Sequence, residues 1–185
     1  MKTRLLLPTL LAAACSSQGT ASPPGRLAID QVQTSGTLTV TSRDFAAGGA
    51  IPKKFSAYGD GMSPRLAWSS LPEGTKSLAI VMEDPDASGS KPFVHWVAWN
   101  LDPAAGAVAA GSVTLGARVG RNGRGGQGYF GPHPSNGAVH HYHFELFALD
   151  GPLSLKPGST REQLLAAIRG HVLGEGELVG TFKKP

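Results

Sequence analysis

The ten residues His140–Leu149 constrain the fold of this chain most strongly, because they form an aromatic and apolar run without glycine or proline. Such a run predicts a β-strand, in which alternate side chains share a face. One face therefore carries His140, Tyr142, Phe144 and Leu146. The preceding loop, 128–137, is rich in glycine and proline and contains the turn Gly131–Pro132. A polar pair at the mouth of an apolar face is a common construction for a small-molecule pocket.

The rest of the chain consists of short strand patterns separated by turn residues, with one helix pattern near the C-terminus. The 185 residues include 25 Gly and 14 Pro, as expected of a β-rich fold with many turns. Predicted strands are Leu38–Ser42, Ser63–Trp68, Ser77–Glu83, Phe93–Leu101, His140–Leu149 and Glu177–Phe182. Thr160–Arg169 is a predicted helix, because Thr160 and Gln163 fit a capping box. The pattern predicts a mainly β fold, a predominantly antiparallel β-sandwich, in one domain over residues 37–185.

The predicted strand Phe93–Leu101 is largely apolar on both faces, so we expect it to be central and covered on both sides. Strict alternation places His95 on the same face as Val97 and Trp99.

The N-terminus has the features of an export signal. Residues 1–14 begin with basic side chains and continue as an apolar run that is too short to span a bilayer permanently. Cys15, the only cysteine, follows small residues in a pattern that resembles the lipobox of bacterial lipoproteins. We therefore expect residues 15–36 to be a lipid anchor and flexible tether, and the protein to lie in the bacterial cell envelope, anchored in the outer membrane and facing the periplasm. The alternative is an ordinary signal peptide cut near Ala14 or Ala21.

The charge of the chain argues against a nucleic-acid partner. The formal net charge is +4, and Lys2 and Arg4 belong to the predicted leader, so removing these two charges leaves +2. That charge is too small and too scattered for a nucleic-acid-binding surface.

The histidines allow two interpretations. His141 and His143 form an H-x-H pair on one strand face, a spacing seen in metal sites of β-barrels, and a metal-assisted hydrolase would use this pair with His95 and His140. No third ligand is identified by spacing, and an edge-strand histidine pair is more often solvated. Nucleophilic hydrolysis has no candidate, because the chain has no G-x-S-x-G motif and its single cysteine is in the leader.

A second set of residues indicates an anion site. Asp84 ends one predicted strand, His95 lies within the next, and His140 and Tyr142 begin another. If these strands are neighbours, a carboxylate, two imidazoles and a phenol converge beside Gly131–Pro132. Imidazole, phenol and backbone N–H groups are donors suited to an anion, with Asp84 orienting and charging a histidine. The alternative is that His95 is a satisfied core histidine and Asp84 a cap.

The chain also resembles the phosphatidylethanolamine-binding protein family in its bacterial Raf-kinase-inhibitor-like branch. The resemblance covers about Leu38 to Phe182. Its two signature blocks contain Asp84-Pro85-Asp86 with His95-Trp96, and Gly131-Pro132-His133-Pro134 with Gly137 and His140-His141-Tyr142. The chain departs from the family pattern at His141, where Arg is usual, and at Ser135, where a second Pro is usual.

The resemblance implies a two-sheet antiparallel sandwich with a small anion-binding cavity. It carries over Asp84, His95, Gly131, Pro132, His140 and Tyr142 as ligand-binding residues. We therefore expect a non-catalytic envelope binding protein for phosphate or a phospholipid head group, without cofactor or metal. Eukaryotic members restrain kinases or proteases, so an inhibitor of an unidentified partner enzyme is a further interpretation, by fold analogy alone.

Overall fold

The computed structural model describes residues 25–113, 115–135 and 137–185, and this part of the chain forms two antiparallel sheets and one α-helix. The large sheet has the order β6-β4-β3-β7-β8, made of Arg118–Val119, Phe93–Leu101, Ser77–Asp84, Val139–Leu149 and Val172–Lys183. The small sheet has the order β1-β2-β5, made of Thr39–Thr41, Leu66–Ser69 and Ala107–Val108. The helices are α1, Arg161–Ile168, and the short 3-10 helices η1, Ile29–Gln31, η2, Lys53–Phe55, and η3, Pro103–Ala105. The predicted two-sheet sandwich with a small late helix is confirmed.

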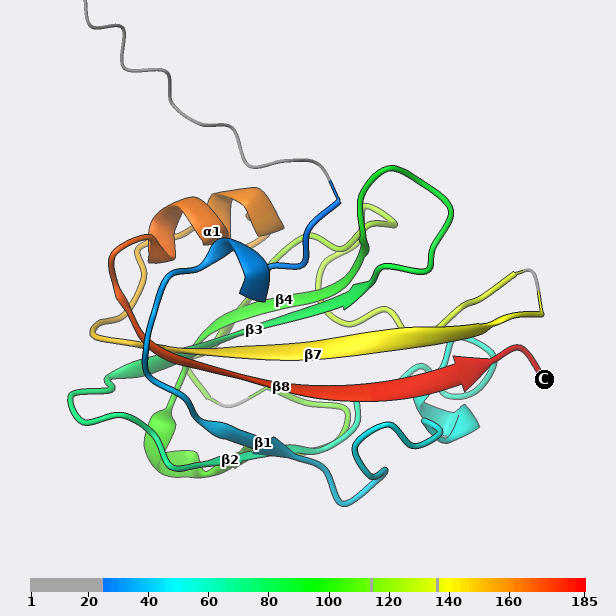
Figure 1. Ribbon diagram of the computed structural model, residues 1–185, viewed down its shortest axis with the longest axis horizontal. Coiled ribbons are helices and arrows are strands. Elements are labelled where there is room, and N and C mark those ends of the chain that lie inside the picture. Colours follow the sequence, from blue (N-terminus) through cyan, green and yellow to red (C-terminus); the bar gives the residue numbers. More distant parts are fainter. Residues whose placement is uncertain (1–24, 114, 136) are drawn as a thin grey trace, which may run out of the picture.

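The elements are stacked in three layers (Figure 1). Helix α1 and η1 cover one face of the large sheet, and strands β1 and β2 lie on the opposite side. The core between the sheets includes Phe55, Trp96, Tyr142 and Phe144. A second core lies under α1 and includes Val97, Trp99, Phe147 and Leu164.

Strand β7 follows the alternation predicted for it. Tyr142 and Phe144 lie in the core between the sheets, whereas Phe147 packs in the core under α1. Because β7 pairs with β3 on one side and β8 on the other, its polar first residues are held at the end of the sheet.

Strict alternation in β4 is wrong, because two β-bulges interrupt it. Met82 pairs with Trp96 and Glu83 with Val94, so His95 is an extra residue opposite β3. A bulge re-aims its side chains, and here His95 turns toward the core between the sheets, where it contacts Tyr142, while Val97 faces α1. The second bulge is at Asn100, which has a φ of 58°. Strand β4 is otherwise largely buried on both faces, as expected.

The predicted helix is confirmed, with its capping box. The Thr160 side chain accepts a hydrogen bond from the Gln163 backbone N–H, and the Gln163 side chain accepts one from the Thr160 N–H. The cap satisfies backbone donors that the first turn of any helix leaves unpaired.

Packed structure begins before residue 37. Ala28 is fully buried under α1, its backbone N–H donates to Glu83, and Ile29 and Val32 pack on the same core. Residues 25–36 therefore lie on the fold instead of forming part of a free tether. The predicted signal peptide and Cys15 lie outside the described residues. Within the described ranges, no helix is long and apolar enough to cross a membrane.

Candidate functional site

The polar residues predicted for the site converge at one end of the large sheet, on the side that faces the small sheet. Asp84 is the last residue of β3, which lies between β4 and β7 in the sheet. His95 comes from the β4 bulge, and His140 and Tyr142 come from the start of β7. The strand order therefore places the carboxylate between two imidazoles.

Asp84 fixes the orientation of His140. The His140 Nδ1 donates to Asp84 Oδ2 at 2.8 Å, and the two residues are 5% and 3% exposed. The same Asp84 oxygen lies 4.0 Å from His95 Nε2, beyond hydrogen-bond distance. The predicted role of Asp84 as the residue that orients a histidine thus fits the geometry at His140.

His95 differs from the expected cationic donor. Its Nδ1 donates to the backbone carbonyl of Phe130 at 2.7 Å. Burial lowers the pKa of His95 to about 4, and the Phe130 carbonyl and the Asp84 carboxylate offset this only in part. The ring is therefore neutral at physiological pH. Because its one proton is on Nδ1, Nε2 is a hydrogen-bond acceptor.

The Tyr142 hydroxyl is fully buried and makes no hydrogen bond of good geometry within the described residues. It lies near the Asp84 carboxylate and the backbone N–H of His133. Burial and the charge of Asp84 raise the pKa of Tyr142, so the hydroxyl keeps its proton. A buried polar group without a partner requires an explanation, and a bound ligand is one.

The Gly131–Pro132 turn closes the site against the 55–57 segment. A Cβ on Gly131 would lie 2.6 Å from the Phe55 carbonyl oxygen, so only glycine fits without movement of the backbone. The Pro132 carbonyl accepts a hydrogen bond from the Ala57 N–H at 3.1 Å. Both turn residues are buried, and the turn brings backbone groups next to the polar cluster.

Aromatic rings surround the cluster, and sequence reasoning missed them. Phe130 stacks on His95 with 5.6 Å between ring centroids, and Phe93 packs against both of these rings. Tyr58 stacks on His133 at 4.8 Å. The only sequence signal for the role of Phe130 was its position next to Gly131. Strand periodicity does not predict which loop carbonyl will bond to His95.

The cluster is nearly closed to solvent. Asp84, His95, His140 and Tyr142 are each at most 5% exposed.

The two histidines of the H-x-H pair are each bonded to a different carboxylate. His141 donates to Asp86 from its backbone N–H and through Nδ1, and His143 Nδ1 lies 2.7 Å from Glu177 Oε1. Across residues 25–113, 115–135 and 137–185, no three His, Cys, Asp or Glu side chains come together in a group able to hold a metal. The hydrolase interpretation therefore gains no support from this geometry.

Comparison with known proteins identifies relatives along most of the chain. The family model for phosphatidylethanolamine-binding protein matches residues 41–183. A UPF0098 protein of Methanothermobacter thermautotrophicus is 40% identical over 152 residues, which cover 80% of this chain and 99% of that protein. LppC of Mycobacterium tuberculosis, whose name assigns it to the lipoproteins, is 44% identical over 147 residues, covering 79% of this chain and 72% of LppC.

Solved structures also show similarity to phosphatidylethanolamine-binding proteins. The phosphatidylethanolamine-binding protein homologue CT736 of Chlamydia trachomatis has a TM-score of 0.76 and 40% identity, covering 82% of this chain and all of CT736. E. coli YbcL has a TM-score of 0.73 at 24% identity, over 81% of this chain and 100% of YbcL, which shows a shared fold.

Proposed function

Because the chain belongs to the phosphatidylethanolamine-binding protein family, we propose that it is a non-catalytic binding protein for a small oxyanion, phosphate or a phosphate-bearing head group. The observation that carries the proposal is the buried Asp84 carboxylate, 2.8 Å from His140 and 4.0 Å from His95. Beside it lies the Tyr142 hydroxyl, which makes no hydrogen bond of good geometry among the described residues. Buried polar groups gathered at one point are typical of a binding site.

The donors and acceptors of the site select the form of the ligand. Asp84 and the neutral His95 Nε2 are acceptors, so an oxyanion meets repulsion unless a proton accompanies it. The proton arrives either on the ligand, as the P–OH of a phosphate monoester with a second pKa near 6, or on the His140 ring. Both routes add a proton to the complex. Affinity should therefore fall as pH rises.

We further propose that the protein is a lipoprotein of the cell envelope, anchored through Cys15 in the outer membrane. The leader pattern of residues 1–14 and the 44% identity to LppC support this assignment. A single acyl group gives only marginal membrane binding, so stable anchoring needs the multiple acyl chains of a lipoprotein cysteine.

Calorimetric titration with phosphoethanolamine tests the binding proposal. We expect proton uptake on binding, seen as a dependence of the heat on the ionisation enthalpy of the buffer. Loss of one charge-assisted hydrogen bond in His140→Ala should weaken binding roughly ten- to a hundredfold. His141→Ala is the matched control, because His141 is bonded to Asp86 on the other face and should change affinity little.

Three outcomes contradict the proposal. These are no binding by the parent protein, an affinity that rises with pH, or a larger loss for His141→Ala than for His140→Ala. Glycerophosphoethanolamine, a diester without a P–OH group, separates the two routes for the proton. It binds weakly if the ligand brings the proton and normally if His140 takes it.

A further inference from the structure

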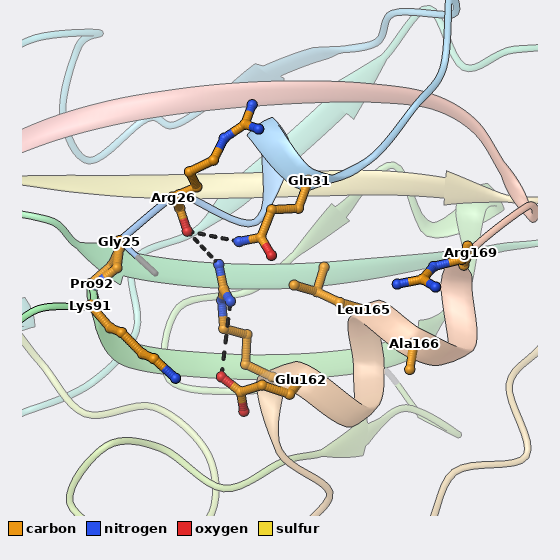
Figure 2. A pocket seen from close by; sticks show the side chains of 10 residues that line it. Gly25, Arg26, Gln31, Lys91, Pro92, Glu162, Leu165, Ala166 and Arg169 are labelled. Atoms are coloured by element: carbon orange, nitrogen blue, oxygen red, sulfur yellow. Dashed lines mark hydrogen bonds and ion pairs between the residues drawn. The ribbon is translucent and has the colours of Figure 1, made fainter. Parts of the chain in front are cut away.

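A polar hollow lies beside α1, on the face of the large sheet opposite the Asp84 cluster (Figure 2). It has a volume of about 280 Å³ and is lined by residues 25, 26 and 31 of the N-terminal segment, by Lys91 and Pro92 before β4, and by α1. The cluster around Asp84 lies on the other side of the sheet, so the two regions share no residue.

Arg161 is held rigidly in the wall of this hollow. It is 8% exposed, and its Nε lies 2.7 Å from the fully buried Glu83 carboxylate. Its Nη2 donates to the Arg26 carbonyl at 2.8 Å. The remaining nitrogen, Nη1, has only Glu162 nearby, at 3.9 Å, among the described residues. A guanidinium held by Glu83 and the Arg26 carbonyl, with Nη1 facing only the exposed Glu162 carboxylate, is a preorganised donor for an oxyanion.

The charge around the hollow is positive. Glu83 offsets Arg161. Burial and the charge of Glu83 raise the pKa of Glu145 behind it well above the usual range, which disfavours a second negative charge there. Figure 2 shows Lys91 reaching toward Glu162, and Arg169 extending along α1 toward Leu165. The side chains that remain accessible in the hollow are thus two cations, Lys91 and Arg169, and one anion, Glu162.

The wall between the cations is apolar. Leu165 and Ala166 of α1 line it on one side and Pro92 on the other. The volume of about 280 Å³ is just below the roughly 300–1,000 Å³ of small-molecule pockets. The hollow therefore fits a single charged group and a few carbons.

We propose that this hollow is a second oxyanion site, which takes a carboxylate or phosphate carried on a short apolar chain. The oxyanion accepts hydrogen bonds from Arg161 Nη1 and lies between Lys91 and Arg169, while the chain packs on Leu165 and Ala166. The proposal does not depend on ligand binding at Asp84.

Hexyl phosphate, followed by ¹H–¹⁵N NMR of the full chain, tests the proposal. Saturable shifts should appear in α1 and near Lys91, and inorganic phosphate, which lacks the apolar chain, should bind this site more weakly. Lys91→Gln combined with Arg169→Gln should weaken binding roughly tenfold, since two partly screened contacts are lost. Arg118→Gln is the matched control, because Arg118 is exposed and its Nη1 bonds carbonyls of its own loop.

Ala166→Phe fills the hollow without changing charge. Ala166 is exposed on α1, so the variant should keep the parent melting temperature and lose hexyl phosphate binding at this site. The proposal is overturned if Ala166→Phe binds like the parent, if shifts are confined to residues around His140, or if Arg118→Gln weakens binding as much as the double variant. Vesicles of phosphatidylglycerol identify the source of the oxyanion: displacement of hexyl phosphate indicates a lipid head group, and its retention a free ligand.

Discussion

Glu145→Gln should stabilise the protein at high pH. Glu145 is fully buried under the N-terminal segment, where Oε1 accepts a hydrogen bond from the Ile29 N–H at 3.3 Å. Burial is the largest cause of its raised pKa, and the neighbouring charge of Glu83 adds to it. The carboxyl is therefore protonated in the folded protein at a pH where the unfolded chain, with an ordinary pKa of 4.5, has released the proton.

The sign and size of the effect follow from this difference. The folded state binds one more proton than the unfolded state, so the free energy of unfolding falls as pH rises from 4.5 toward the folded pKa. One proton corresponds to about 1.4 kcal/mol per pH unit, or roughly 3–6 °C in melting temperature for a domain of this size. Glutamine has the same shape and no proton to lose, so this part of the slope should disappear.

Urea unfolding of the parent and of Glu145→Gln between pH 5 and 8 measures the two slopes. The variant should be the more stable protein at pH 8, and the difference should shrink toward pH 5. Burial also raises the pKa of Glu83, which interacts with Glu145, so the change in slope reports the behaviour of this carboxyl pair. Equal slopes, or a variant less stable than the parent at pH 8, would refute a protonated Glu145.

Three further substitutions test other parts of the account. Gly131→Ala should lower the free energy of unfolding in urea by about 1–3 kcal/mol and weaken phosphate binding, because the alanine Cβ would meet backbone atoms of the 55–57 segment within 2.8 Å. Unchanged stability and binding would refute this close approach. Asn100→Ala should cost about 1–3 kcal/mol, since the Asn100 amide bonds the backbone N–H and C=O of Leu153, at 2.8 and 3.0 Å, from a left-handed backbone. Cys15→Ser should move the protein from the detergent phase to the aqueous phase in a partition assay, and a variant that stays in the detergent phase would exclude lipidation.

Local patterns were sufficient to predict most of the fold. The two-residue period of His140–Leu149 gave the correct faces of β7, and the spacing of Thr160 and Gln163 gave the helix start. Both features depend on interactions among residues close in sequence. A pattern of that kind is visible without the tertiary structure.

The parts of the site that could not be predicted depend on contacts across the fold. The bulge at His95 arises from the pairing of β3 with β4, and the neutral state of the ring from its burial beside the Phe130 carbonyl. His95, which was expected to donate a hydrogen bond to the ligand, therefore offers Nε2 as an acceptor. Likewise, alternation placed Glu145 on the face of the strand away from Tyr142. Its burial beside Glu83 depends on the N-terminal segment, which packs over both carboxyl groups.

A crystal soaked in phosphate at pH 6 tests the proposed function most directly. We expect density for an oxyanion within hydrogen-bond distance of the Asp84–His140 pair, with one ligand oxygen facing His95 Nε2 and others facing the backbone near Gly131. Density for phosphate only in the hollow beside α1, or none at the Asp84 cluster when phosphoethanolamine is also soaked, would contradict it.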